Sequence, residues 1–225
     1  MGDSFRNNSP LALYNEHEIK KMVCENPEII EILKNHRIPL RLNMKEIYEL
    51  RNGHCQTTQD ICVKIAKNIP PDLRQFINIK DLKDAAILHD FGKVLIPAKI
   101  LNKNSVLTQE EYKIMNLHSE LGYQLLKTTG VNQNVQNLVR YHHNIDGNYL
   151  PDINLQILNL ADKYSALTEN RVYRKQYSPA QALKIIHNDV LKGNIDPLLF
   201  HALVNAIKNE NDAISKSLYK TTNAA

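Results

Sequence analysis

Apolar residues recur at spacings of three and four along most of the chain, which is the pattern of helices that bury one face. The pattern covers residues 14–34 and 44–68, and Pro70 and Pro71 end the second segment. Further faces of this kind follow in residues 112–125, 135–142 and 157–167. No segment alternates apolar and polar residues in the manner of a strand, so the sequence predicts an all-α fold.

Two segments carry recognisable helix start or stop signals. Asp81 is expected to be the N-cap of a short helix, and Gly92 is expected to supply a left-handed residue at its end. Thr108 and Glu111 have the spacing of a capping box that opens the next long helix.

Later signals complete the division of the chain. Two more helices are predicted to begin at Ser178-Pro179 and at Asp196-Pro197, and the polar end after residue 209 is expected to fray. We therefore expect an N-terminal helical extension (1–43), a main helical domain (44–208) and a polar C-terminal tail (209–225). The extension is expected either to pack on the main domain or to mediate contact with a homodimer or signalling-protein partner.

Composition limits the classes of function. Hydrophobic residues make up 43% and charged residues 23% of the 225 positions, which excludes collagen-like and wholly disordered proteins. The net charge of +4 comes from dispersed basic residues, so no nucleic-acid polymer is expected as a partner. No apolar run approaches the length of a membrane span, so no membrane insertion is expected. The three cysteines lack CxxC spacing and follow no signal-peptide-like segment, which favours the cytoplasm.

Four histidines and two aspartates fall at inward positions of different predicted helices. They are His54, His89, His118, His142, Asp90 and Asp162. A lone histidine on an apolar face is mostly a hydrogen-bonded core residue. Burying all six side chains costs several kcal/mol unless each is paired, and a divalent metal pairs them together. Nitrogen and oxygen ligands without thiolate favour Fe, Mn, Co, Ni or Zn in an open site.

Several ordered motifs strengthen this interpretation. The run LHDFGKVLIP (88–97) resembles the signature of the HD superfamily of metal-dependent phosphohydrolases, in the form found in its HD-GYP branch. Further blocks resemble the same branch in the same order. They are LTQEEYKIMNLHSELGYQLL (107–126), the His142-His143 pair, LNLADKYSALTENRVYRK (158–175) and SPAQALKII (178–186). The resemblance implies an HD-domain helical bundle.

Carried over residue by residue, the resemblance implies a dinuclear metal centre. The ligands would be His54, His89, Asp90 and Asp162 for one ion, and Asp90, His118, His142 and His143 for the other. Asp90 would bridge the two ions, and the nucleophile would be a metal-bridging hydroxide that attacks a phosphodiester. Some relatives supply a Glu for a third metal one turn before the first ligand, but Leu50 stands there, so two metals are expected.

Three basic residues match substrate-contacting positions. Lys93 is expected to contact a non-bridging phosphate oxygen, which makes it a catalytic and substrate-binding candidate beside Asp90. Arg171 and Arg174 match an RPYR-like segment, and either binds phosphate or guanine edges or belongs to a basic loop that faces solvent. Ser165 stands where many relatives have a second Asp, so no role passes to it.

The namesake GYP motif is degenerate in this chain. In HHNIDGNYLP (142–151) an Asn follows the histidine pair, and Asn-Tyr-Leu-Pro replaces the usual ending. The resemblance implies a cyclic dinucleotide phosphodiesterase, with cyclic di-GMP as substrate and pGpG or GMP as product. The altered loop leaves open hydrolysis of another nucleotide or phosphate ester. A non-catalytic nucleotide-binding or adaptor module is the third alternative.

Overall fold

The structure, a computed structural model, describes residues 14–143, 152–170 and 175–222, with side chains described up to residue 209. Over these residues it contains helices and no strand, which confirms the predicted all-α fold. The helices are α1 (Glu16–Cys24), α2 (Pro27–Asn35), α3 (Met44–Leu50), α4 (Gln56–Asn68), α5 (Pro71–Arg74), α6 (Ile79–Leu88), α7 (Ala98–Leu101), α8 (Gln109–Lys127), α9 (Gln133–Tyr141), α10 (Ile153–Thr168), α11 (Pro179–Leu191) and α12 (Pro197–Thr222).

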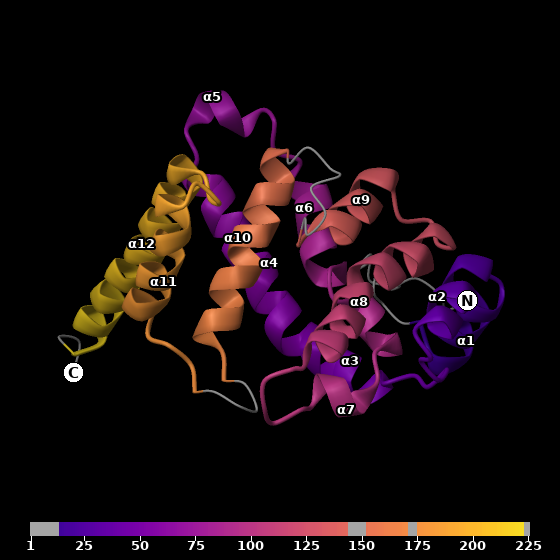
Figure 1. Ribbon diagram of the computed structural model, residues 1–225. Coiled ribbons are helices and arrows are strands. Elements are labelled where there is room, and N and C mark those ends of the chain that lie inside the picture. The colour runs from indigo at the N-terminus through magenta and orange to yellow at the C-terminus, as the bar shows by residue number, and fades with distance from the viewer. Residues whose placement is uncertain (1–13, 144–151, 171–174, 223–225) are drawn as a thin grey trace, which may run out of the picture.

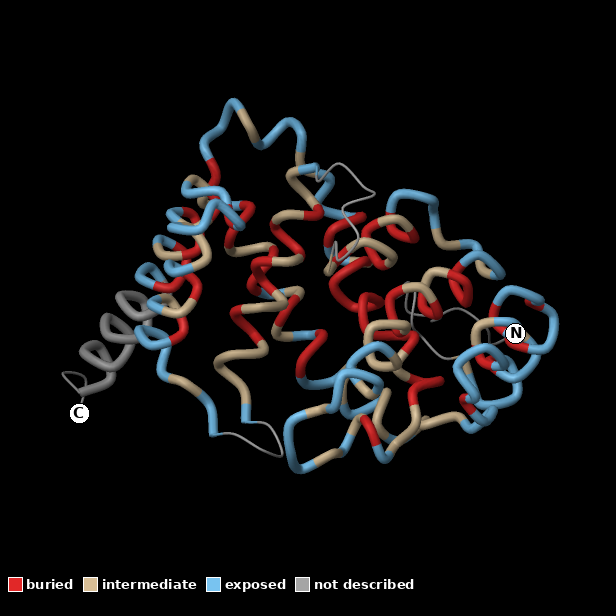
Figure 2. The backbone as a smooth tube through the Cα atoms, in the orientation of Figure 1, coloured by how far each residue is buried: buried red, intermediate tan, exposed pale blue. Residues whose placement is uncertain are grey.

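Two short irregular helices join these elements. A π-helical turn (Arg51–Cys55) links α3 to α4, and a 3-10 helix (Phe91–Leu95) follows α6. The centre of the bundle is formed by α4, α6 and α10, with α8 and α9 on one side and α11 and α12 on the other (Figure 1). Buried residues concentrate where these helices face one another, and the outer turns are exposed (Figure 2).

The N-terminal segment packs against the rest of the bundle. Helices α1 and α2 lie on α8 and bring four aliphatic side chains into the core, which are Ile19, Val23, Ile29 and Leu33. The helical pattern of residues 14–34 is split into two helices because Asn26 caps α2 and Pro27 occupies its first turn. The Asn26 side chain also donates a hydrogen bond to the carbonyl of Gln124 in α8, at 3.0 Å.

The start of α6 differs from the prediction. Asn78, not Asp81, is the N-cap, and its side-chain oxygen accepts the backbone N–H of Asp81 at 3.0 Å. The Asp81 carboxylate accepts from the side chains of Asn78 and Asn132, at 2.8 and 2.7 Å. Asn has a preference similar to Asp for the capping position, so local preference alone did not separate these two candidates.

Gly92 also differs from the prediction, because it is not in the left-handed region. It lies inside the 3-10 helix, where a Cβ atom would come within 2.0 Å of the His118 carbonyl oxygen and 2.5 Å of the Gly122 amide nitrogen. The missing side chain therefore lets the segment that carries Asp90 and Lys93 approach α8 closely. This contact fixes the distance between two parts of the site described below.

The remaining helix starts agree with the prediction. Thr108 and Glu111 form a capping box, as does Ser178 with Gln181, and α12 begins at Pro197. Helix α12 continues to Thr222, and the fraying expected after residue 209 stays a prediction. The boundary expected at residue 43 falls between α2 and α3.

Candidate metal centre

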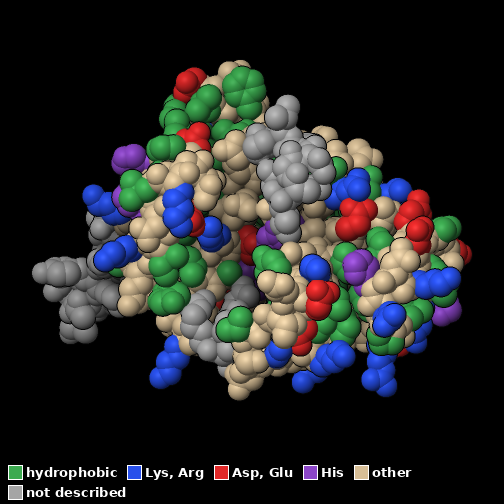
Figure 3. Space-filling view, viewed as in Figure 1, with side chains coloured by type: hydrophobic (Ala, Val, Ile, Leu, Met, Phe, Trp, Pro, Cys, Tyr) green, Lys and Arg blue, Asp and Glu red, His purple; other side chains and the backbone are tan. Residues whose placement is uncertain are grey.

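The histidines and aspartates singled out from the sequence lie close together at one site. They are His54 in the π-helical turn, His89 and Asp90 after α6, His118 in α8, His142 and His143 after α9, and Asp162 in α10. Successive ring centroids lie 5.1–5.3 Å apart along the series His54, His89, His142 and His118. Figure 3 shows histidine and acidic side chains at the floor of a hollow in the middle of one face.

Two imidazoles and two carboxylates form what we call the carboxylate end of the site (His54, His89, Asp90 and Asp162). His54 Nε2 lies 2.9 Å from Asp162 Oδ1. His89 Nε2 lies 3.5 Å from Asp90 Oδ2 and 3.7 Å from Asp162 Oδ1. His89 Nε2 is fully buried and has no hydrogen-bond partner among the described residues. A buried lone pair without a partner that faces two carboxylates is stabilised by a positive charge between the nitrogen and the carboxylate oxygens.

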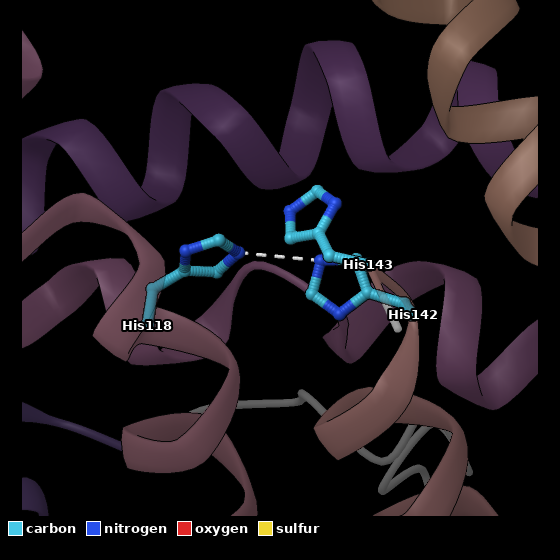
Figure 4. A group of neighbouring side chains, drawn as sticks. All are labelled: His118, His142 and His143. Carbon is cyan, nitrogen blue, oxygen red and sulfur yellow. Dashed lines mark hydrogen bonds between the residues drawn. The ribbon is translucent and has the colours of Figure 1, made fainter. Parts of the chain in front are cut away.

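Three imidazoles form what we call the imidazole end (His118, His142 and His143), whose donor atoms all lie within 4.8 Å of one another. His118 Nε2 and His142 Nε2 face each other at 3.2 Å (Figure 4). Asp90 reaches both ends, because its Oδ1 lies 3.4 Å from His118 Nε2 while its Oδ2 faces His89. A single carboxylate is therefore placed to be shared by the two ends.

Hydrogen bonds to the backbone fix the protonation of three of these rings. In each, Nδ1 lies at hydrogen-bond distance from the carbonyl three residues earlier: His89 to Ala86 (2.8 Å), His118 to Met115 (2.6 Å) and His142 to Val139 (2.7 Å). A carbonyl only accepts, so Nδ1 carries the proton and Nε2 of the neutral ring is left with a lone pair. His118 and His142 thus direct two lone pairs at each other.

The imidazole end is electrically neutral. Burial lowers the pKa of His118 to about 3, and the nearby charge of Lys93 acts in the same direction. Burial and the neighbouring histidines hold the pKa of His142 well below its usual range. Because both rings stay unprotonated at neutral pH, no proton separates their facing lone pairs.

The carboxylate end behaves in the opposite way. Burial lowers the pKa of His54, but hydrogen bonds to Asp162 and Glu169 outweigh it and raise this pKa to about 9. Burial raises the pKa of Asp90, yet the charges of Lys93 and the histidines outweigh it and hold the pKa of this carboxyl well below its usual range. Anionic carboxylates at this end are already paired with cationic groups.

Comparison with models of protein families shows which family the chain belongs to. A family model described as "HD domain" matches residues 42–199, which is well over half of the sequence. The chain belongs to the HD domain family. This confirms the superfamily assignment that the ordered motifs predicted.

Known relatives of this HD domain are named as phosphodiesterases of cyclic dinucleotides. The chain is 28% identical over 160 residues to 3'3'-cGAMP-specific phosphodiesterase 1 of Vibrio cholerae, an alignment that covers 67% of this chain and 36% of that protein. It is 33% identical over 133 residues to a cyclic di-GMP phosphodiesterase of Pseudomonas aeruginosa, covering 55% of this chain and 32% of the relative. The chain thus spans about a third of the length of these relatives.

Solved structures show the same fold. The HD domain of the L. monocytogenes phosphodiesterase PgpH in complex with cyclic-di-AMP superposes with a TM-score of 0.55 at 16% identity, over 87% of this chain and 95% of that one. At this identity the similarity establishes the fold alone. Within the described part of the chain, no helix combines the length and the apolar character that a membrane span requires.

Sequence reasoning missed one contact of this HD domain. Glu169, the residue that caps the C-terminus of α10, places its Oε2 at 3.0 Å from His54 Nδ1. Ser165, to which no role was assigned, donates to the other Glu169 oxygen at 2.8 Å and lies 3.2 Å from the same His54 nitrogen. The available signal was the spacing, because residues 165 and 169 follow Asp162 by three and seven positions on one helix face.

The basic residues expected to bind substrate are only partly described. Lys93 Nζ lies 2.7 Å from Asp90 Oδ2, so this lysine is an ion-pair partner of the central carboxylate rather than a solvated side chain. Arg171, Arg174 and the degenerate GYP loop after His143 lie outside the described residues.

Proposed function

We propose that this HD domain is a phosphodiesterase that hydrolyses a cyclic dinucleotide with two divalent metal ions. The proposed ligands are His54, His89, Asp90 and Asp162 for one ion, and Asp90, His118, His142 and His143 for the other. The carrying observation is the pair of opposed Nε2 lone pairs of His118 and His142, 3.2 Å apart in rings that stay neutral. Two acceptors held this way in a buried site repel each other unless a cation lies between them.

The spacing of the donor atoms fits such ions. Two ligands bound at about 2.1 Å to one ion lie roughly 3.0 Å apart at a right angle and roughly 3.4 Å apart at the tetrahedral angle. The separations of 3.2 Å between His118 and His142, 3.4 Å between His118 and Asp90, and 3.5 Å between His89 and Asp90 lie close to these values. Nitrogen and carboxylate donors favour Mn, Fe, Co, Ni or Zn.

Each part of the centre would contribute a defined step. Two divalent cations held by these residues would supply Lewis-acid stabilisation of a phosphodiester and would activate a water molecule for attack. Asp90, with one oxygen toward each end, holds the two ends at a fixed separation. Lys93 is a cation next to both ends of the site. It pairs with Asp90 now and would turn to a non-bridging phosphate oxygen when substrate enters.

Relatives and chemistry together support a cyclic dinucleotide as substrate. The two relatives described above are named for hydrolysis of cyclic GMP-AMP and of cyclic di-GMP. A ligand with two phosphates suits a site with two cations and Lys93 beside them. We propose cyclic di-GMP as the substrate, opened to pGpG or cut further to GMP, with Arg171 and Arg174 contacting phosphate or guanine.

Metal analysis combined with a substrate panel tests this function. Protein purified without chelators is expected to hold two metal ions per chain and to hydrolyse bis(p-nitrophenyl) phosphate. Cyclic di-GMP, 3'3'-cGAMP and cyclic di-AMP are then compared at equal concentration. Turnover of the model ester without turnover of any cyclic dinucleotide would transfer the proposal to another phosphate ester. Absence of all activity in a fully metallated sample would identify a binding or adaptor module.

A further inference from the structure

The four most deeply buried histidines of the site do not hold their Nδ1 atoms in the same way. His89, His118 and His142 each bond to a backbone carbonyl within their own helical turn. His54 instead bonds to a side chain on another helix, the Glu169 carboxylate, at 3.0 Å and 115 residues away along the sequence. Its orientation therefore depends on a residue that a single substitution can remove.

The local helix geometry is consistent with this difference. His54 lies in the π-helical turn (Arg51–Cys55), whereas the other three rings lie in or directly after α-helices. Ser165 reinforces the replacement contact, because its hydroxyl donates to Glu169 Oε1 at 2.8 Å while Glu169 Oε2 faces the imidazole. The Ser165 hydroxyl thus holds the Glu169 carboxylate in an orientation that faces the His54 imidazole.

Opposite ring atoms of His54 have different partners. Nδ1 faces Glu169 at 3.0 Å, and Nε2 faces the interior of the site, 2.9 Å from Asp162 and 3.8 Å from Asp90. A carboxylate on Nδ1 retains the proton on that atom and leaves the Nε2 lone pair for a metal ion. It also raises the basicity of the ligating nitrogen.

We propose that Glu169 is a positioning residue of the carboxylate end, which fixes the tautomer and ring orientation of His54 for metal binding. This inference rests on the proposed metal-dependent function. Ser165, one helical turn earlier on α10, lies 3.2 Å from the same His54 nitrogen but is uncharged, so the carboxylate on this nitrogen comes from Glu169. Glu169 then supplies the charge that Ser165 lacks.

Titration of metal-free protein with Mn²⁺ measures the effect. Wild type is expected to bind two ions, and Glu169→Ala is expected to weaken one of the two sites about 10- to 100-fold while the other is unchanged. Glu169→Gln, which preserves volume, is expected to give an intermediate loss. Glu120→Ala is the matched control, because Glu120 is as shielded as Glu169, with 30% and 28% exposed side chains, and it pairs with Arg140 outside the site. This control is expected to keep both affinities.

Relocating the carboxylate separates positioning from mere packing. Ser165→Asp in the Glu169→Ala background is expected to restore the weakened Mn²⁺ site, whereas Ser165→Asn in the same background is expected not to. Nitrogen-15 NMR of the histidine rings in the Zn²⁺-loaded proteins adds a direct readout. The His54 Nδ1–H signal is expected in wild type and in the Asp variant, and is expected to shift or vanish in Glu169→Ala.

The outcomes distinguish this inference from the function on which it rests. If wild type binds neither Mn²⁺ nor Zn²⁺, the proposed function fails. If wild type binds two ions and Glu169→Ala and Glu169→Gln bind both with wild-type affinity, the function stands and the role of Glu169 is refuted. Equal recovery by the Asp and Asn variants would also refute it, because the carboxylate charge would then be unnecessary.

Discussion

The carboxylate end and the imidazole end of the centre place the same residue type in different surroundings. At the carboxylate end, His54 lies between Asp162 and Glu169, and its pKa is raised to about 9. At the imidazole end, His118 faces another imidazole, and burial with the charge of Lys93 lowers its pKa to about 3. Without metal, His54 at the first end is paired with two carboxylates, whereas His118 and His142 at the second end direct their lone pairs at each other.

The opposite pKa shifts of His54 and His118 indicate which end is stabilised more by binding an ion. Protons on His54 compensate the nearby carboxylates in the metal-free protein, so an ion must displace a proton there. No proton has to leave His118 or His142, because both are already neutral at pH 7. We therefore expect the imidazole end to gain more from the first ion, and Asp90 to couple the two ends.

Loss of Asp90 should have the largest effect, because it removes the link between the two ends. Asp90→Ala is expected to release both ions and to lower turnover about 1000-fold or more, since metal stabilisation of the transition state is worth several kcal/mol. Metal content and hydrolysis of bis(p-nitrophenyl) phosphate are measured together. Asp84→Ala, which removes an acidic side chain of α6 paired with Lys80, is the control. An Asp90→Ala protein that retains two ions and normal activity would refute the proposed dinuclear centre.

Loss of His118 should separate the ends. His118→Ala is expected to leave one ion per chain, bound at the carboxylate end, and to lower the rate at least about 100-fold, because each cation contributes several kcal/mol. Metal analysis of the purified protein gives the stoichiometry, with His187→Ala as a control because His187 packs on Phe200 away from the centre. Retention of both ions would show that the imidazole end is not a separate site.

Replacement of Lys93 should leave both ends intact. Lys93→Ala is expected to lower the rate or the affinity for substrate about 10- to 100-fold, because a charge-assisted hydrogen bond is worth roughly 1.5 to 3 kcal/mol. Metal content should stay at the wild-type value, which distinguishes a phosphate contact from support of Asp90. Exposed Lys99→Ala is the control. Loss of metal in Lys93→Ala would assign the lysine to the centre itself.

The smallest expected effect concerns pH in the chelated, metal-free protein. The pKa of His118 is lowered to about 3 on folding, so the unfolded chain binds more protons, and its contribution to stability is lost as pH falls from about 6.5 toward 3. The pKa of His54 is raised to about 9, so its contribution is present below about 6.5 and is lost as pH rises through 9. Chemical unfolding across this range should show a maximum near pH 6.5.

Two variants test which histidine causes the loss of stability on each side of the pH maximum. His118→Gln is expected to reduce the slope of the acidic limb, to which His142 also contributes, and His54→Gln is expected to reduce the slope of the alkaline limb. The comparison between the ends is contradicted if either substitution flattens the opposite limb.

Several features followed from short-range sequence alone. The capping box at Thr108 and the helix starts at Ser178-Pro179 and Asp196-Pro197 depend on residues within one helical turn, so neighbours along the chain suffice to predict them. The set of inward histidines and aspartates followed from helical spacing and from the ordered HD motifs. Their assignment as metal ligands stays a prediction.

Other features depended on residues far apart in the sequence. Gly92 matched a helix-ending signal, but its actual role is to let the 3-10 helix touch the backbone of α8. Asn78 rather than Asp81 became the N-cap, and Asp81 instead accepts a hydrogen bond from Asn132 at the start of α9. Local preference could not resolve these choices, because packing between helices decided them.

Sequence by itself determined the chemistry available to the site, because residue types and their helical phase place imidazoles and carboxylates on buried faces. Tertiary structure decided how they are paired. His54 meets Glu169 across 115 residues, and His118 meets His142 with two lone pairs facing each other. The physical reason is that a hydrogen bond within a helical turn is set by local backbone geometry, whereas a contact between helices exists only after the whole core has packed.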